Sequence, residues 1–462
     1  MLLGENLLFD WLSNKEELGI QVTVIILICV VCGVYLWWNM RVPWIANPAV
    51  WFVINQLRMT LGTVFLLEFD YHPEDCVHLF SMLSVTIFFI IGASMAKAMS
   101  SCSATFITSW RSLPIQVEVG KHFSLFITIF LIFSSVISTL YFYFVGYNIF
   151  LLGIYSQITG QDLIQDAATM RLYSYAGERY FAPGYVNQFK NTLLPLLVSY
   201  LGLRSYLLGR RHGLILSIIL TPIVVVLLLG TGQRGAFVLA LMYFLIFLVN
   251  VFRHLKWRYI VLPITAAIVL FLITSLIIGR GSSEFKDVDD MLELSMEVPG
   301  RIFEGNQASG VIGFRYIYPE PIRWGKEWLV EVKQMLPGLK DQNHIPIDSL
   351  IFASMYGSTR GTAPLSLIGS LWYNFYIIGI TILPLIFGVI YQKIYHLLIK
   401  GRKTLFRLMV FSGLAGVLGV WGSGGINTLL NTGVATILLF LILGKWVLGM
   451  DLKRKYAEVN PP

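Results

Sequence analysis

The sequence has few charged residues for its length. Asp, Glu, Lys and Arg make up 13% of the 462 residues, about half of the roughly 25% found in soluble domains. Hydrophobic residues make up 56%. This composition excludes a soluble globular protein, so we predict an integral membrane protein whose main partner is the lipid bilayer. The net charge of +8 is typical of the Lys/Arg excess in cytoplasmic loops. Because no nucleic-acid motif is present, we expect no nucleic-acid partner.

Cysteine is also scarce, with four residues in the whole chain. Cys29 and Cys32 have Cys-x-x-Cys spacing, but they lie in the apolar run 19–38 without a histidine or a second cysteine pair beside them. That setting disfavours a metal or redox site. The P-loop, the His-Glu-x-x-His motif and a dinucleotide-binding turn after a strand are absent. We therefore expect no cofactor and no metal.

Long apolar stretches account for most of the chain. A helix needs about 20 mostly apolar residues to cross a bilayer. Eleven stretches meet this requirement, namely 19–38, 44–67, 77–99, 123–147, 191–208, 214–232, 235–252, 259–279, 364–390, 405–420 and 427–448. The second stretch contains Asn55, Gln56 and Arg58, so one of its sides must face protein or water. We predict a single all-α polytopic membrane domain over residues 1–462.

The charge of the short connections alternates along the chain. Segments 1–18 and 68–76 are acidic. The alternate connections are basic, with Arg111 and Lys121, then Arg204, Arg210 and Arg211, then Arg253, Lys256 and Arg258, then Lys393, Lys400, Arg402, Lys403 and Arg407, and finally Lys453, Arg454 and Lys455. Since Lys and Arg collect in cytoplasmic loops, we predict an N-terminus outside and a C-terminus inside. An acidic N-terminus does not suit a signal peptide, so 19–38 is expected to remain as a membrane anchor.

Two segments are too long to be simple connectors. Residues 148–190 and 280–363 both fall on the predicted outer face, and long loops in compact folds often carry function. Within the second segment, 291–304 and 326–336 have the pattern of short amphipathic helices. We predict that these two large extracytoplasmic loops carry the chemistry of the protein.

The outer loops and the adjacent helix ends are rich in arginine. The set comprises Arg171, Arg179, Arg234, Arg280, Arg301, Arg315, Arg323 and Arg360. Arg234 and Arg280 follow apolar stretches within glycine-rich turns, Gly-Thr-Gly-Gln-Arg-Gly at 230–235 and Ile-Gly-Arg-Gly at 278–281. A guanidinium fork suits a phosphate, and a lipid-linked diphosphate would hold its headgroup at this depth. The alternative is a set of interfacial arginines that only extend toward water.

A general base would have to come from the same loops. We favour His344 and Asp348, because Gln-Asn-His-Ile-Pro-Ile-Asp at 342–348 leads directly into the next apolar helix. Tyr173 is a third candidate if a neighbouring arginine lowers its pKa. The remaining outer candidates are Glu178 and Glu304. For each carboxylate, a solvated charge or an ion-pair partner is the structural alternative.

A series of short motifs resembles those of a known family. The motifs, in chain order, are Arg-Leu-Tyr-Ser-Tyr at 171–175, Gly-Thr-Gly-Gln-Arg-Gly-Ala at 230–236, Arg-Gly at 280–281, Met-Leu-Pro-Gly-Leu at 335–339 and Ala-Pro-Leu-Ser-Leu-Ile-Gly-Ser-Leu-Trp-Tyr-Asn at 363–374. Together with the predicted architecture, this order resembles the Wzy-type polysaccharide polymerases of the O-antigen polymerase/ligase superfamily. The resemblance is strongest to the enterobacterial-common-antigen and related O-antigen polymerases.

The resemblance implies a GT-C-like fold with about 11 transmembrane helices and a metal-independent glycosyltransferase activity. Such enzymes join undecaprenyl-diphosphate-linked oligosaccharide repeats on the outer face of a bacterial inner membrane. By this resemblance the diphosphate would be bound by Arg171, Arg234, Arg280 and Arg301, and we add Arg315 and Arg360 from the same set of outer arginines. The resemblance does not identify the base, so the candidates remain those taken from the residues themselves, His344, Asp348 and Tyr173. A chain-length regulator protein is a further partner that the resemblance implies.

Other functions remain open. Glu68-Phe69-Asp70, after the second stretch, is compatible with a glycosyltransferase that uses a lipid-monophosphate sugar and a carboxylate base. A flippase of lipid-linked glycans would also use a cation-rich cavity, although the internal repeats typical of transporters are absent. An O-antigen ligase is less favoured, because Ser-Thr-Arg-Gly at 358–361 replaces the histidine that precedes the corresponding helix in ligase-like relatives.

Overall fold

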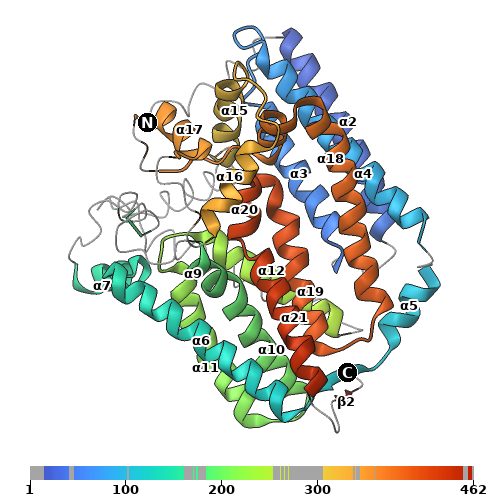
Figure 1. The fold of residues 1–462 in the computed structure, drawn as a ribbon, viewed down its shortest axis with the longest axis vertical. Coiled ribbons are helices and arrows are strands. Elements are labelled where there is room, and N and C mark those ends of the chain that lie inside the picture. Colours follow the sequence, from blue (N-terminus) through green and yellow to red (C-terminus); the bar gives the residue numbers. More distant parts are fainter. Residues whose placement is uncertain are drawn as a thin grey trace.

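Helices make up nearly all of the regular structure in this computed structural model (Figure 1). It describes residues 15–40, 46–100, 104–160, 170, 173–174, 184–252, 261, 265, 269, 305–336, 339, 344–357, 359, 361–450 and 456–459. The elements of the first half are α2 (Lys15–Met40), α3 (Pro48–Val64), α4 (Glu74–Ala98), α5 (Ala104–Ser112), β1 (Ile115–Glu118), α6 (Lys121–Val145), α7 (Ile149–Thr159), α9 (Tyr185–Asn187), the π-helical turn η2 (Gln188–Leu193), α10 (Leu194–Leu207), α11 (Arg211–Leu229) and α12 (Arg234–Val251). Those of the second half are α15 (Gly305–Ile317), α16 (Lys326–Met335), α17 (Ile347–Tyr356), α18 (Leu367–Lys400), α19 (Leu405–Val420), the 3-10 turn η3 (Trp421–Ser423), α20 (Ile426–Asn431), α21 (Val434–Met450) and β2 (Tyr456–Val459).

Within the described residues, seven helices are long and apolar enough to cross a membrane, namely α2, α4, α6, α11, α12, α18 and α19 continued by η3. Large apolar side chains stay exposed on their outer faces, such as Trp37 on α2 and Ile218 on α11. Contact with lipid tails rather than water explains this exposure. The predicted all-α polytopic membrane protein is therefore confirmed in outline.

The second predicted stretch, 44–67, forms the shorter helix α3, which lies inside the bundle. Its first turn is capped by Asn47, whose side chain accepts a hydrogen bond from the Ala49 amide (3.0 Å). Gln56 and Thr60 are buried one turn apart, and the helix packs on α2, α18 and α19. Its polar side chains thus face protein, as their position in an apolar stretch requires.

Other predicted elements differ in detail. Instead of one span over 427–448, the chain forms α20 and α21, separated by a turn in which Gly433 has φ +108°. The stretch 191–208 begins with the π-helical turn η2 before α10. The amphipathic helix expected at 326–336 is α16. The expected span 259–279 and helix 291–304 lie outside the described residues, apart from isolated positions.

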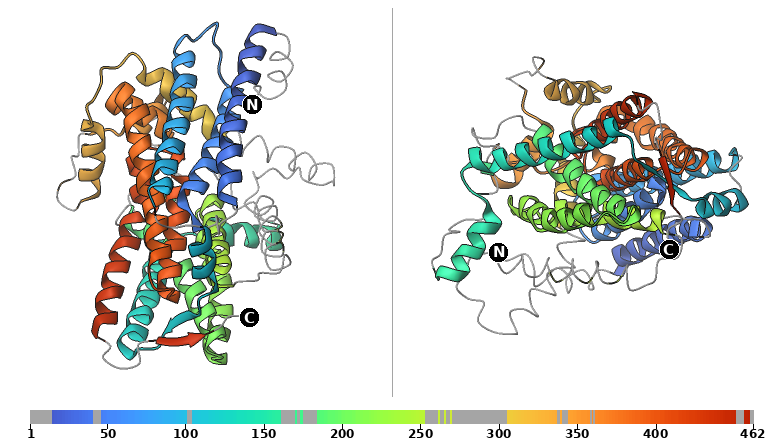
Figure 2. Two further views of the ribbon diagram at one scale, coloured as in Figure 1. Left: turned by 90° about the vertical axis from the view of Figure 1, so that its right-hand side faces the viewer. Right: turned by 90° about the horizontal axis from the view of Figure 1, so that it is seen from below.

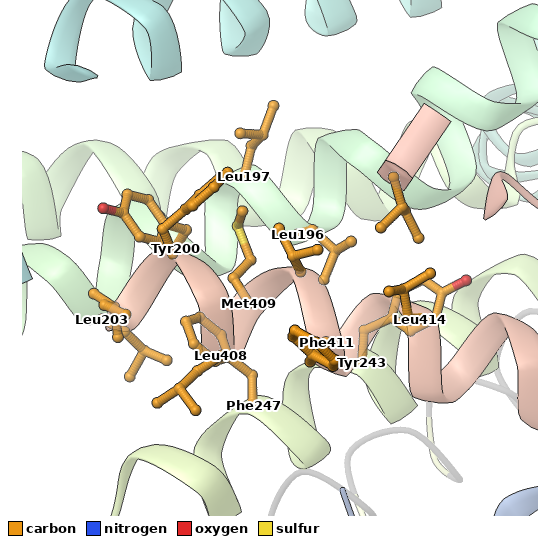
Figure 3. Close-up of a cluster of buried hydrophobic side chains, with 14 of the residues drawn as sticks. Leu196, Leu197, Tyr200, Leu203, Tyr243, Phe247, Leu408, Met409, Phe411 and Leu414 are labelled. Carbon is orange, nitrogen blue, oxygen red and sulfur yellow. The ribbon is translucent and has the colours of Figure 1, made fainter. Parts of the chain in front are cut away.

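Two hydrophobic cores hold the bundle together. One joins α6, α10, α12 and α19, and Figure 3 shows Tyr200, Tyr243 and Met409 among its side chains. The other joins α3, α4 and α18. There α4 and α18 approach so closely that a Cβ at Gly92 would lie 2.0 Å from the Leu385 carbonyl oxygen. Glycine is required at such a crossing because any side chain would separate the two backbones.

The basic connections that the structure describes meet at one end of the bundle. The strands β1 and β2 pair antiparallel there, and Figure 1 shows β2 at this end. The Lys403 ammonium donates to the carbonyl groups of Arg111 (2.8 Å) and Leu113 (3.2 Å). The buried Glu118 carboxylate accepts hydrogen bonds from the Tyr200 hydroxyl (2.8 Å) and the Phe406 amide (3.0 Å). We refer to this end as the basic end.

The acidic connection 68–75 lies at the opposite end, together with α15, α16 and α17 (Figures 1 and 2). Asp75, at the start of α4, is fully buried and pairs with Arg315 of α15. The Asp75 carboxylate also accepts a hydrogen bond from the Glu68 amide (2.8 Å). The ion pair therefore fixes α15 against the turn between α3 and α4.

Candidate functional site

A small polar pocket lies at the end of the bundle opposite the basic end, between α16, α17 and the start of α18. Its volume is about 220 Å³. Its polar lining comes from Arg323, Glu327, His344 and Tyr373, and its apolar lining includes Ile347 and Leu350. A pocket that combines convergent polar groups with an apolar wall is the usual form of a small-molecule site. We refer to it as the His344 pocket.

A kink in α18 positions the residues of this pocket. Tyr376 interrupts the helix with φ 54° and ψ −134°, a conformation that costs a non-glycine residue energy. Just before the kink, the carbonyl of Tyr373 accepts a hydrogen bond from the Arg323 amide (3.1 Å), and that of Asn374 accepts one from Gly325 (3.1 Å). The segment leading into α16 is thus attached to α18, and Trp328 strengthens the attachment by donating its indole N–H to the Ser370 hydroxyl (2.8 Å).

His344 and Glu327 form an imidazole–carboxylate pair in the pocket. The His344 Nε2 atom lies 3.4 Å from the Glu327 Oε1 atom, and both side chains are mostly buried. On the other side of the pocket, Arg323 donates from Nε to the Tyr373 hydroxyl (2.8 Å). A carboxylate beside an imidazole can orient it and stabilise its protonated form. The arrangement therefore places an imidazole beside a carboxylate and near the Arg323 guanidinium, which also pairs with Glu320 (3.2 Å).

Asp348, the second predicted base, has a mainly structural position. Its carboxylate accepts a hydrogen bond from the Leu365 amide (3.0 Å), and its backbone carbonyl accepts one from Ala363 (2.9 Å). These bonds attach the start of α17 to the chain that enters α18. Burial raises the pKa of Asp348 to about 6. Asp348 lies near His344 in the fold, but it does not line the pocket with it.

Glu331 is a functional candidate that sequence reasoning missed. It lies one turn after Glu327 on the same face of α16, and its carboxylate accepts a hydrogen bond from the Asn427 amide of α20 (3.2 Å). Burial, assisted by the carboxylates of Asp348 and Glu327, raises the pKa of Glu331 to about 8. Its carboxyl group therefore retains its proton at neutral pH. The sequence signal was the Glu-x-x-x-Glu spacing on an amphipathic helix.

The predicted arginines do not converge within the described residues. Arg315 makes a bidentate ion pair with Asp75, at 2.6 Å and 3.0 Å, so its charge is already neutralised by a buried partner. Arg234 begins α12 and is half-buried. Its helix packs mainly on α10, α11 and α19, whereas α15 packs on α3, α4 and α17. The expected diphosphate ligands Arg171, Arg280, Arg301 and Arg360 lie outside the described residues, as does Arg179.

A second basic residue, Lys190 of η2, lies near the turn before Arg234, and burial lowers its pKa to about 7. This side chain is fully buried, and its Nζ atom has no hydrogen-bond partner among the described residues. The rings of Tyr141 and Phe142 lie 5.5 Å and 5.6 Å from Nζ. Phe142 also contacts the turn, because a Cβ at Gly230 would lie 2.5 Å from its ring. A π-helical turn often marks a functional site, and sequence reasoning gave no weight to Lys190.

Tyr173, the third predicted base, is exposed. Its neighbour Ser174 accepts a hydrogen bond at its carbonyl from the Tyr141 hydroxyl (2.5 Å). Tyr173 therefore lies on the Lys190 side of the molecule rather than in the His344 pocket. In the acidic triplet Glu68-Phe69-Asp70, the Glu68 carboxylate lies 3.7 Å from Arg315. Glu68 therefore belongs with the Asp75–Arg315 ion pair.

The short helix α20 connects the two polar regions. Near its start the Asn427 amide donates to Glu331, and just after its end the Thr432 carbonyl accepts a hydrogen bond from Thr192 (2.7 Å), two residues from Lys190. A helix rises 1.5 Å per residue, so these two attachment points lie roughly 8 Å apart along the chain axis.

Among the residues that the structure describes, no group of three or more His, Cys, Asp and Glu side chains is placed to hold a metal ion. Comparison with known proteins gives no further assignment: no family model, no curated protein and no solved structure matches the chain.

Proposed function

We propose that this protein polymerises undecaprenyl-diphosphate-linked oligosaccharide repeats by glycosyl transfer at the outer face of a bacterial inner membrane. The observation that carries the proposal is the His344–Glu327 pair at 3.4 Å in a pocket shared with Arg323. The basic end is then cytoplasmic, in keeping with the distribution of Lys and Arg in membrane proteins. This orientation puts the His344 pocket on the outer side, where lipid-linked repeats are assembled.

In the proposed reaction, His344 removes the proton from the attacking hydroxyl group of the acceptor sugar. Glu327 stabilises the imidazolium that results, and Arg323 with Tyr373 orients the sugar. The hydroxyl oxygen forms a bond to the anomeric carbon of the donor, and the bond from that carbon to the diphosphate oxygen breaks. The diphosphate leaves with the bonding electrons, and the proton stays on His344 until solvent accepts it. A positioned base of this kind contributes roughly 10²–10⁴ in rate.

Cations near the first outer loop support the departure of the diphosphate in this proposal. Lys190 packs beside Phe142, which contacts the turn before Arg234, and positive charge on these two residues would stabilise a developing anion. The helix α20 holds this region at a defined distance from the His344 pocket. Two lipid-tethered substrates bound together would also gain the rate advantage of proximity.

The decisive experiment supplies purified protein in lipid with undecaprenyl-diphosphate-linked repeats, excess chelator, no ATP and no nucleotide sugar. A product ladder spaced by whole repeats supports polymerisation. One added sugar, obtained only with a lipid-monophosphate donor, would instead assign a single-sugar glycosyltransferase. An unchanged product that has crossed the bilayer would assign a flippase. A ladder that disappears with chelator and returns with Mg²⁺ would contradict the metal-independent mechanism.

The proposed orientation of the protein in the membrane can be tested separately. Cys76 is exposed at the start of α4, close to Asp75, and Leu113 is exposed at the basic end. In a background without other cysteines, a membrane-impermeant maleimide added outside the cell should label Cys76. A Leu113→Cys variant should react only after the membrane is opened. The reverse pattern would place the His344 pocket in the cytoplasm and overturn the proposal.

Transport of the same lipid-linked glycans is a second candidate, favoured by one observation. The helix pair α20 and α21 is discontinuous, and a buried, protonated carboxyl at Glu331 attaches to it. Broken helices with ionisable partners are typical of transporter binding sites. The same gel assay separates this candidate from polymerisation, since a transporter leaves glycan length unchanged.

A further inference from the structure

A second, larger cavity lies at the basic end, where α10 turns back into α11. Its volume is about 510 Å³. The residues that line it include Arg204, Ser205, Arg210, Arg211, His212 and Gly213. Figure 1 shows the connection between α10 and α11 at the same end as β2. The cavity is therefore on the far side of the bundle from the His344 pocket, and the proposed glycosyl transfer does not use it.

Small residues build this cavity by bringing α10 and α11 into close contact. A Cβ at Gly202 would lie 2.5 Å from the Ser217 hydroxyl oxygen, and a Cβ at Gly213 would lie 2.2 Å from that of Ser205. The chain reverses at Gly209, which has φ +66°. Such close crossings are typical of membrane helices with small residues at their interface. The tight hairpin fixes the positions of the basic side chains that follow.

The cavity carries several positive charges without anionic partners. Arg210, Arg211 and His212 are exposed, and no described residue forms an ion pair or a side-chain hydrogen bond with any of them. Glu118, the acidic residue that contacts Arg204, offers its backbone carbonyl to the Arg204 Nε atom (3.0 Å). Its carboxylate is buried and bonded elsewhere. No carboxylate among the described residues therefore competes for the cavity.

Two further features favour a phosphate group on a lipid. The helix α11 has no side-chain cap at its N-terminus, so its first amide groups add partial positive charge to the cavity wall. Directly beyond the arginines, Ile215, Ile218 and Ile219 are more than half exposed along α11. An acyl chain can lie on this apolar strip while its headgroup occupies the cavity. Arginines that only extend toward water would need no cavity.

We propose that this cavity at the basic end binds the phosphate group of an anionic phospholipid. The guanidinium groups of Arg210 and Arg211 contact the phosphate oxygens, and the acyl chains run along α11. Basic pockets between transmembrane helices on the cytoplasmic side are suited to this class of headgroup. The inference does not depend on the proposed polymerase function.

The test uses native mass spectrometry of the purified full chain with phosphatidylglycerol, phosphatidylcholine or inorganic phosphate as separate probes. Wild type should retain phosphatidylglycerol in preference to phosphatidylcholine. The double variant Arg210→Gln, Arg211→Gln should lose at least about tenfold in affinity, the effect expected for two basic side chains at an anionic surface. The matched control Lys393→Gln, Lys400→Gln removes two exposed cations from the same end and should bind as wild type does.

Other outcomes are equally informative. An equal loss in the lysine control would show a general surface field and overturn the site, as would the absence of any phosphatidylglycerol preference in wild type. Saturation by inorganic phosphate that matches the lipid in affinity would overturn the lipid assignment. The variant Arg210→Lys, Arg211→Lys keeps the charge and should retain most of the binding. If the lysine variant still binds, and both arginine double variants melt at the wild-type temperature, the loss of binding in the glutamine variant is not a loss of folding.

Discussion

Glu331 of α16 accepts a hydrogen bond from the Asn427 amide of α20, with 3.2 Å between the carboxylate oxygen and the nitrogen. This bond joins the wall of the His344 pocket to the broken helix that reaches Thr192 and η2. The Glu331 carboxyl group is buried and carries a proton at neutral pH. The charge state of Glu331 therefore matters for stability as well as for the site.

The first prediction concerns stability against pH for Glu331→Gln. The folded-state pKa of Glu331 is about 8, above its ordinary value of 4.5, so the folded protein binds this proton more tightly than the unfolded chain does. The stabilisation is complete below pH 4.5 and is lost as pH rises to about 8. Glutamine resembles the protonated form, so at pH 8.5 the variant should melt at least about 2 °C above wild type. Glu320→Gln is the control, because the Glu320 carboxylate is not among the groups that raise the pKa of Glu331, and it should show no such gain.

The second prediction separates His344 from Asp348. His344→Gln should lower the rate of polymerisation by about 10² or more, because a general base is lost, with little change in melting temperature. Asp348→Asn keeps an acceptor for the Leu365 amide and should retain activity. Asp348→Ala loses that acceptor and should destabilise the fold by about 1–3 kcal/mol. Polymerisation rates of the three variants, divided by the amount of folded protein that size-exclusion chromatography recovers, test these expectations. An Asp348→Asn variant that folds normally but has no activity would identify Asp348, and not His344, as the base.

The third prediction uses Lys190, whose ammonium group is buried without a hydrogen-bond partner among the described residues. Lys190→Met keeps the length of the side chain and removes a buried polar amine, whose pKa burial lowers to about 7, so the melting temperature should stay the same or rise. If the ammonium group stabilises the leaving diphosphate, turnover should fall by about tenfold or more. Lys121→Met, at the basic end, should leave both quantities unchanged. Normal turnover in Lys190→Met would exclude Lys190 from the site.

The fourth prediction concerns the ion pair between Asp75 and Arg315. Asp75→Ala or Arg315→Ala alone leaves a buried charge without its partner and should cost about 3–5 kcal/mol. The double variant should lose less than the sum of the two single losses. Activity per folded molecule should be retained, because Arg315 is engaged with Asp75 and not with substrate. Additive losses would contradict the coupling between Asp75 and Arg315. An Arg315→Lys variant that folds normally but is inactive would indicate that Arg315 binds the diphosphate.

Composition and apolar length predicted the class of fold, because lipid exposure imposes a strong and local requirement on each helix. The same signals predicted that one side of α3 faces protein or water, because its polar residues cannot face lipid. They did not predict the break between α20 and α21 or the kink at Tyr376, since both depend on contacts with segments far away in the sequence.

The candidate site was predictable only in part. The position of His344 before an apolar helix was a usable signal, but its partner Glu327 comes from a separate helix, and nothing local to either residue indicates the pairing. Arg315 was expected to bind diphosphate because charge and loop position look alike for a ligand and for an ion-pair partner. Asp75, which decides between them, lies 240 residues away in the sequence.

The central claim is that the chain makes glycosidic bonds by releasing the lipid carrier, and one measurement tests it most directly. Purified protein is given a lipid-linked repeat labelled in both the glycan and the carrier, and free undecaprenyl diphosphate is counted against new linkages. We predict one carrier released for each repeat added by wild type and by Asp348→Asn, with both products lost together in His344→Gln. Extension of the glycan without release of undecaprenyl diphosphate, or an unimpaired His344→Gln variant, would contradict the account.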